Sequence, residues 1–98
     1  MIINVNTDGT KSTVVLEGRL DTTTAPELET KLEGFIDSTT ELVYDFKNLD
    51  YISSAGLRVV LLSQKKMNKL GSMKIINTKA EIKEIFDMTG FSDIINIE

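Results

Sequence analysis

The sequence predicts an α/β fold: a mostly parallel sheet, an antiparallel strand at its N-terminal edge, and helices packed mainly on one face. Five short apolar segments are present, and three segments of helical periodicity follow the second, third and fourth of them, giving the order ββαβαβαβ. Helical crossovers between consecutive strands require parallel pairing and are right-handed, which places all three helices on one side. The 98 residues suffice for one core, so we expect a single domain over residues 1–98.

The first two strands form a predicted hairpin. Residues 2–6 alternate apolar and polar side chains, and residues 12–18 are rich in β-branched residues. Asp8-Gly9 between them is a turn signal. The remaining strands are expected at residues 42–46, 74–77 and 94–97.

Each predicted helix has a start signal. Thr24 and Thr78 each open a Thr-x-x-Glu capping box, and Ser54 opens the central helix, so we expect all three to be N-caps. Gly71, in a left-handed conformation, and Gly90 are expected to end the second and third helices. The three apolar faces are, in chain order, Leu28, Leu32, Phe35 and Ile36; Leu57, Val60, Leu61, Gln64 and Met67; and Ile82, Ile85 and Phe86.

Composition excludes several classes of function. The chain has no cysteine and no histidine, so it lacks a thiolate nucleophile, a Ser-His-Asp triad, the usual zinc ligands and an imidazole proton shuttle. Its net charge of −4 argues against nucleic-acid binding, which depends on neutralising phosphates. No apolar run is long enough to cross a bilayer, and the N-terminus does not resemble a signal peptide. We therefore expect a cytoplasmic protein without membrane insertion.

Polar residues converge at one edge of the predicted sheet, where the loops after parallel strands meet. Asp21 and Thr22 follow the second strand, Asp45 ends the third, and Ser53 precedes the central helix. The two aspartates could end strands by accepting backbone N–H bonds, or could serve acid/base chemistry or a magnesium ion. No third ligand and no nucleophile-activating base accompanies them, so we expect no metal site and no cofactor.

The residues that follow Ser54 favour a functional role for it in addition to helix capping. Ala55 and Gly56 are small, and glycine in a first helical turn costs up to about 1 kcal/mol relative to alanine. A helix start with such small side chains would let the backbone of a partner protein approach closely. The free N–H groups of that turn can also hold a phosphate.

Four segments, taken together, resemble the STAS-domain anti-sigma factor antagonists. The longest resembles the family's phosphorylation motif and runs Leu49-Asp50-Tyr51-Ile52-Ser53-Ser54-Ala55-Gly56-Leu57-Arg58-Val59. The others are Gly18-Arg19-Leu20-Asp21, Val43-Tyr44-Asp45-Phe46 and Phe86-Asp87-Met88-Thr89-Gly90-Phe91. The matches are in register and cover essentially the whole chain.

The resemblance implies a binding switch and not an enzyme. Family members bind an anti-sigma factor that is also an ATP-binding serine kinase, and this frees the sigma factor. The kinase phosphorylates the serine that matches Ser54, which ends the interaction, and a PP2C-type serine phosphatase reverses it. We expect the free protein to be a monomer, with partner contacts at Asp21, Thr22, Asp45, Ser53, Ala55, Gly56 and Arg58.

One position departs from the family pattern. Family members commonly have aspartate immediately before the phosphorylated serine, and this chain has Ser53, which becomes a secondary candidate for phosphorylation. The departure leaves open a constitutive STAS adaptor in a signalling, secretion-control or lipid-transport assembly. A small enzyme or nucleotide binder is disfavoured, because the chain has no glycine-rich phosphate loop and no basic residue within residues 53–56.

Overall fold

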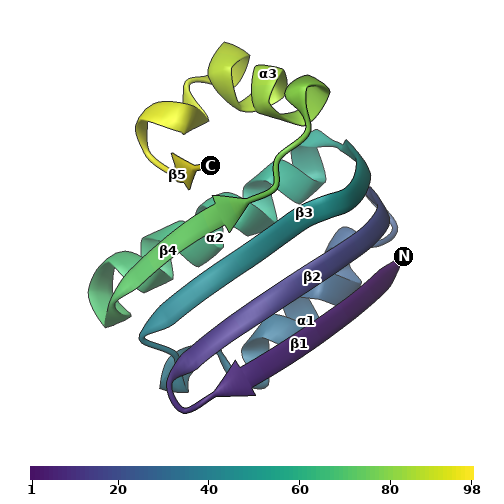
Figure 1. Cartoon of the computed structure of the whole chain (residues 1–98). Helices are drawn as coiled ribbons and strands as arrows, with labels where there is room; N and C mark the ends of the chain where they lie inside the picture. Colours follow the sequence, from purple (N-terminus) through teal and green to yellow (C-terminus); the bar gives the residue numbers. More distant parts are fainter.

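The elements of the fold follow the predicted order in the computed structural model, which describes all 98 residues (Figure 1). The strands are β1 (Ile2–Asp8), β2 (Lys11–Leu20), β3 (Glu41–Ile52), β4 (Ser72–Ile76) and β5 (Asn96–Ile97). The helices are α1 (Ala25–Glu33), α2 (Ser54–Leu70) and α3 (Ala80–Thr89), with short 3₁₀ turns at Ile36–Ser38 and Phe91–Asp93. The strands lie in the order β1-β2-β3-β4-β5, with β1 antiparallel to β2 and the other pairs parallel, which confirms the fold class.

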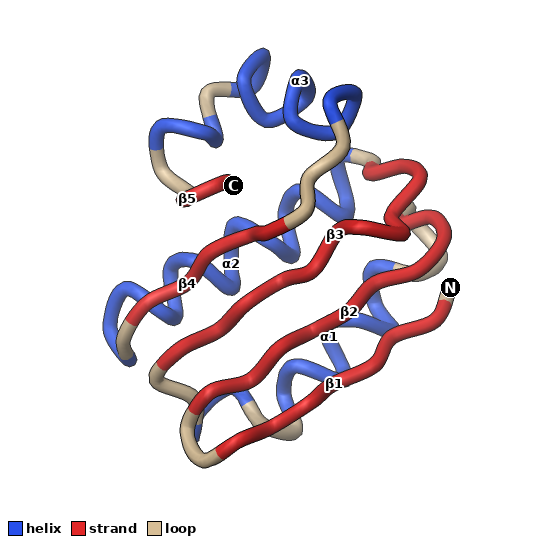
Figure 2. The backbone as a smooth tube through the Cα atoms, in the orientation of Figure 1, coloured by secondary structure: helices blue, strands red, loops and turns tan.

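Two of the three helices, α1 and α2, cover one side of the sheet (Figures 1 and 2). Figures 1 and 2 show α1 and α2 side by side behind β1 to β4, while α3 lies beyond the end of β4, close to β5. Phe86 of α3 packs with its ring centroid 6.3 Å from that of Phe46, whose own ring is 5.9 Å from Tyr44. α3 therefore contributes to the same core as the other two helices.

The core is built on alternate residues of the central strands. Val14, Tyr44 and Ile75 lie in register on β2, β3 and β4, and all three are completely buried. The Tyr44 hydroxyl lies 2.7 Å from Ser63 Oγ on α2, which satisfies both buried groups. Burial raises the pKa of Tyr44, so the phenol stays neutral.

The other face of the sheet is open. No helix crosses the face turned toward the viewer in Figure 1. Val15, Asp45 and Ile76 lie in register across β2, β3 and β4, and all three are partly exposed. Because successive side chains of a strand point to opposite faces, Asp45 points away from the helices, between the buried Tyr44 and Phe46.

β2 and β3 run farther than the pattern predicted. The expected strands at residues 12–18 and 42–46 extend to Lys11–Leu20 and Glu41–Ile52. Their pairing shifts register between Val15 and Glu17 and between Gly18 and Arg19, and such bulges break the alternation on which the prediction relied. Asp45 therefore lies within β3, and its expected place at the end of the strand is wrong.

Two of the predicted caps are wrong, and a third lacks its side-chain bond. Ser53, not Ser54, is the N-cap of α2, and Lys79, not Thr78, is the N-cap of α3. Thr24 does precede α1, but its hydroxyl donates to the Arg19 carbonyl oxygen at 2.8 Å and makes no capping bond.

Both predicted glycines end their helices, but only one has the predicted backbone conformation. Gly90 ends α3 in the left-handed conformation, with φ 79°, as expected. Gly71 ends α2 in an extended conformation, with φ 166°, so its predicted left-handed conformation is wrong. Glycine is needed at residue 71 because a Cβ atom there would collide with the Thr40 carbonyl. None of the helices is both long and apolar enough to span a bilayer.

Candidate functional site

The long strands bring two loops together. β2 and β3 stay paired to Leu20 and Ile52, and the Ser53 N–H donates to the Leu20 carbonyl at 2.9 Å. The loop that leads from β2 into α1 therefore lies beside the residues that begin α2. The predicted convergence of Asp21 and Thr22 with Ser53 and Ser54 depends on this pairing.

Asp21 organises the first of these loops. Its Oδ1 accepts hydrogen bonds from the N–H groups of Thr23 (3.1 Å) and Thr24 (3.2 Å) and from the Thr23 hydroxyl (2.8 Å). These bonds, the one from the Thr23 hydroxyl foremost, hold the pKa of Asp21 below its usual value. Arg19 Nε lies 3.8 Å from the same carboxylate. Asp21 thus holds the loop that leads into α1.

Ser53 and Ser54 have different roles at the start of α2. Ser53 Oγ accepts a hydrogen bond from the Gly56 N–H at 3.3 Å, the bond expected of an N-cap. Ser54 is the first residue of the helix and is exposed. The Ser54 hydroxyl takes part in no side-chain hydrogen bond of the chain, so it is available to solvent and to covalent modification.

Gly56 has no room for a side chain, because other residues of the same chain fill the space beside it. It is buried, and a Cβ atom on it would lie 2.7 Å from Leu20 Cγ, 2.9 Å from Ile52 Cγ1 and 2.9 Å from the Leu20 carbonyl oxygen. These distances are shorter than real Cβ contacts. The expectation that its bareness opens space for a partner is therefore corrected: the chain itself fills that space.

A groove of about 600 Å³ lies between the starts of α1 and α2. It brings together four residues that the sequence singled out: Thr22, Ser54, Ala55 and Arg58. Its other lining residues are Ala25, Pro26, Glu29, Val59 and Leu62. Sequence analysis did not single out Pro26, Glu29 or Leu62, although Leu62 follows Arg58 by four residues on α2 and so shares its face. We call this the switch groove.

Asp45 does not belong to this groove. Its Oδ1 accepts bonds from Asn77 Nδ2 at 3.1 Å and from the Lys47 N–H at 3.0 Å, on the open face of the sheet. It shares no hydrogen-bond partner with Asp21, so the two carboxylates act separately. No three aspartate or glutamate side chains come together in the chain in a way that could hold a metal ion.

Comparison with known proteins gives one family. The STAS domain family matches residues 3–98. The anti-sigma-B factor antagonist of Bacillus subtilis is 32% identical over 97% of this chain and 92% of its own length. BtrV of Bordetella bronchiseptica is 38% identical over 81% of this chain and 70% of its own length. Its name describes it as a proposed anti-sigma factor antagonist.

Solved structures of antagonists have the same fold. Unphosphorylated SpoIIAA superposes with a TM-score of 0.86 at 17% identity, over 99% of this chain and 88% of that chain. An anti-sigma factor antagonist from Mycobacterium paratuberculosis gives a TM-score of 0.88 at 23% identity, over 98% of this chain and 83% of that chain. At these identities the likeness establishes the shared architecture.

Proposed function

Because the chain belongs to the STAS-domain family of anti-sigma factor antagonists, which are regulatory binding proteins and not enzymes, we propose that it acts by partner switching. The unphosphorylated protein binds an anti-sigma factor that is also an ATP-dependent serine kinase, and so frees a sigma factor. Phosphorylation of Ser54 by that kinase ends the complex, and a PP2C-type phosphatase restores the binding form. The free protein is a cytoplasmic monomer.

The position of Ser54 is the observation that carries this proposal. The residue is exposed and lines the switch groove, and its hydroxyl has no hydrogen-bond partner within the chain. Because Ser53 supplies the cap, Ser54 can be modified without loss of the bond that begins α2. An added phosphate would meet the free N–H groups and the positive end of the helix dipole.

Ser53 is the less suitable acceptor. Its Oγ is only partly exposed and is engaged with the Gly56 N–H, so a kinase would have to break the cap to reach it. We therefore assign the switch to Ser54 and keep Ser53 as the secondary site. Thr22, Ala55 and Arg58 line the same groove and are the proposed partner contacts around the unmodified Ser54.

A test uses the anti-sigma kinase of the protein's own genome with Mg-ATP, followed by intact-mass and peptide mass spectrometry. We expect one phosphate, on Ser54. Ser53→Ala should still be modified, and Ser54→Ala should gain far less phosphate than the wild type. Phosphate on Ser53 of the wild type, with Ser54→Ala still fully modified, would move the switch by one residue. A kinase that binds the protein without modifying either serine would favour the constitutive adaptor.

A further inference from the structure

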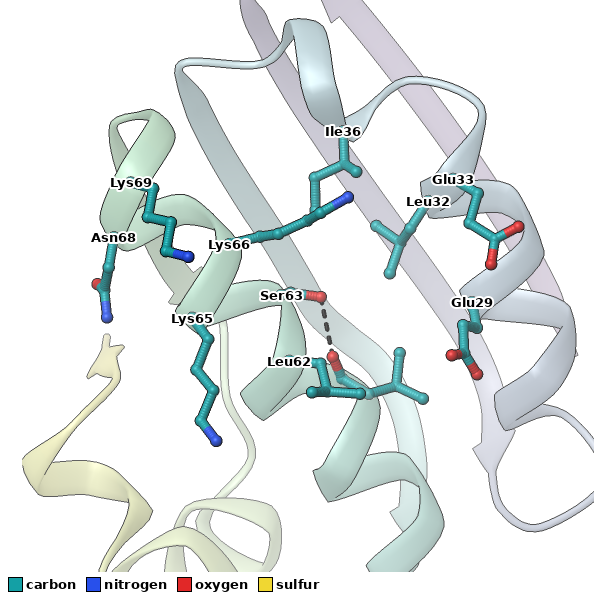
Figure 3. A pocket seen from close by; sticks show the side chains of 11 residues that line it. Glu29, Leu32, Glu33, Ile36, Leu62, Ser63, Lys65, Lys66, Asn68 and Lys69 are labelled. Atoms are coloured by element: carbon teal, nitrogen blue, oxygen red, sulfur yellow. Dashed lines mark hydrogen bonds between the residues drawn. The ribbon is translucent and has the colours of Figure 1, made fainter.

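A second groove, of about 640 Å³, lies farther along the seam between α1 and α2 (Figure 3). Its apolar lining residues are Leu32, Ile36, Val59 and Leu62. Leu62 is 43% exposed, whereas Leu32, Ile36 and Val59 are buried, so Leu62 is the apolar side chain of the lining that an occupant can cover. We call this the seam groove.

All the charged residues that α2 contributes to this groove are basic. The helix carries four basic residues and no acidic one, within a protein of net charge −4. Lys66 pairs with Asp37 at 2.9 Å, whereas Arg58, Lys65 and Lys69 take part in none of the chain's ion pairs. With Leu62, these three unpaired residues fall at intervals of four, three and four, and so form one stripe along α2.

α1 forms an acidic wall. Glu29 and Glu33 line the groove from α1, while Lys65, Lys66 and Lys69 line it from α2 (Figure 3). No ion pair joins the two walls. Apart from Lys66, which pairs with Asp37, the charged side chains of both walls are therefore free to meet an occupant from outside the chain.

The seam groove continues into the switch groove. The two share Glu29, Val59 and Leu62. From Ser54 to Lys69 the α2 side of this path spans roughly 22 Å, at about 1.5 Å per residue. That length matches a helix of about four turns better than a compact small molecule.

We propose that the seam groove docks an amphipathic helix of the anti-sigma factor, with an apolar side chain against Leu62, acidic side chains toward Lys65 and Lys69, and basic side chains toward Glu29. This inference rests on the proposed function and extends its interface beyond Ser54. A helix laid in a groove is a common mode of recognition. Glu29 and Glu33, together with the negative net charge, disfavour nucleic acid or an anionic membrane as the occupant.

Calorimetric titration of the unmodified protein with the anti-sigma factor of its own genome tests the proposal. Leu62→Asp, the milder Leu62→Gln, and the double variant Lys65→Glu/Lys69→Glu change exposed or half-exposed positions, so their melting temperatures should stay near wild type. We expect at least about tenfold weaker binding for Leu62→Asp and for the double variant. Affinity of the wild type should fall with added salt, and that of the double variant should fall less.

Lys83→Glu is the matched control, because Lys83 is exposed on α3 and outside both grooves. It should bind as the wild type does. If the wild type binds and the seam variants bind equally well, the seam inference is overturned while partner binding stands. If the wild type does not bind the anti-sigma factor at all, both the proposed function and the seam inference are overturned.

Two other occupants are distinguishable with the same proteins. A dimer of the free wild type that Leu62→Asp dissociates in sedimentation would show that a second copy fills the groove. A fatty acid retained by the wild type and lost from Leu62→Asp in native mass spectrometry would show a small amphiphile. Either result overturns the helix-docking proposal.

Discussion

At the scale of single residues, Gly56 shows how tightly the start of α2 is packed. The residue touches two strands at once, because its missing side chain leaves room for Leu20 of β2 and Ile52 of β3. Helix propensity alone would favour alanine at this position by up to about 1 kcal/mol. Packing opposes propensity here, and overpacking a filled site costs about 1–3 kcal/mol.

We therefore expect Gly56→Ala to lower the free energy of unfolding by about 1–2 kcal/mol in urea titrations. Gly34→Ala is the matched control. Gly34 has helical dihedral angles, and its added Cβ would lie 3.4 Å from the Lys31 carbonyl oxygen, an ordinary contact. That variant should be neutral or more stable by up to about 1 kcal/mol. Equal stability of the two variants would contradict the packing argument.

At the scale of elements, the sequence predicts the number, order and type of strands and helices but not where the central ones end. Hydrophobic periodicity and turn residues are local signals, and they identified each element. The bulges around Gly18 depend on pairing between β2 and β3, which a single chain segment does not reveal. β3 continues through those bulges to Ile52, which leaves Ser53 as the N-cap and Ser54 as the first residue of α2.

The N-cap assignment gives a test at this scale. Ser53→Ala removes the acceptor of the Gly56 N–H and should lower the free energy of unfolding by about 0.5–2 kcal/mol. Ser54→Ala removes an exposed hydroxyl without a partner and should change stability by less than about 0.5 kcal/mol. Urea titrations of both proteins decide the matter. A larger loss from Ser54→Ala than from Ser53→Ala would restore the cap to Ser54.

The sequence also predicted only part of the candidate site. Motif register pointed to Ser54, loop convergence placed Thr22 near it, and Arg58 follows one turn along the helix, as the switch groove shows. Asp45 was misplaced because the pattern ended β3 too early, and an extended strand turns its side chain to the open face. Gly56 was read as a surface feature because the residues that fill its missing side chain come from distant strands.

At the scale of the whole molecule, the charges around Ser54 separate the stability of the fold from its binding. A negative charge at this position meets the positive end of the α2 dipole, typically worth about 0.3–1 kcal/mol. Arg58 lies four residues along the helix, and an oppositely charged pair at that spacing adds about 0.2–0.5 kcal/mol. Asp45, on the open face of the sheet, does not oppose this charge from within the groove.

Ser54→Asp should therefore melt within a few degrees of the wild type, yet bind the anti-sigma factor at least about thirtyfold more weakly. The charge is stabilised in the free protein, whereas an unpaired charge buried in a complex costs about 2–5 kcal/mol. Ser54→Ala should bind normally and resist inactivation by the kinase. Calorimetric melting and titration of both variants on the same preparations give the comparison. Stability lost in step with affinity would mean that modification deforms the domain. If Ser54→Asp loses neither, Ser54 is no switch, and the protein is a constitutive adaptor.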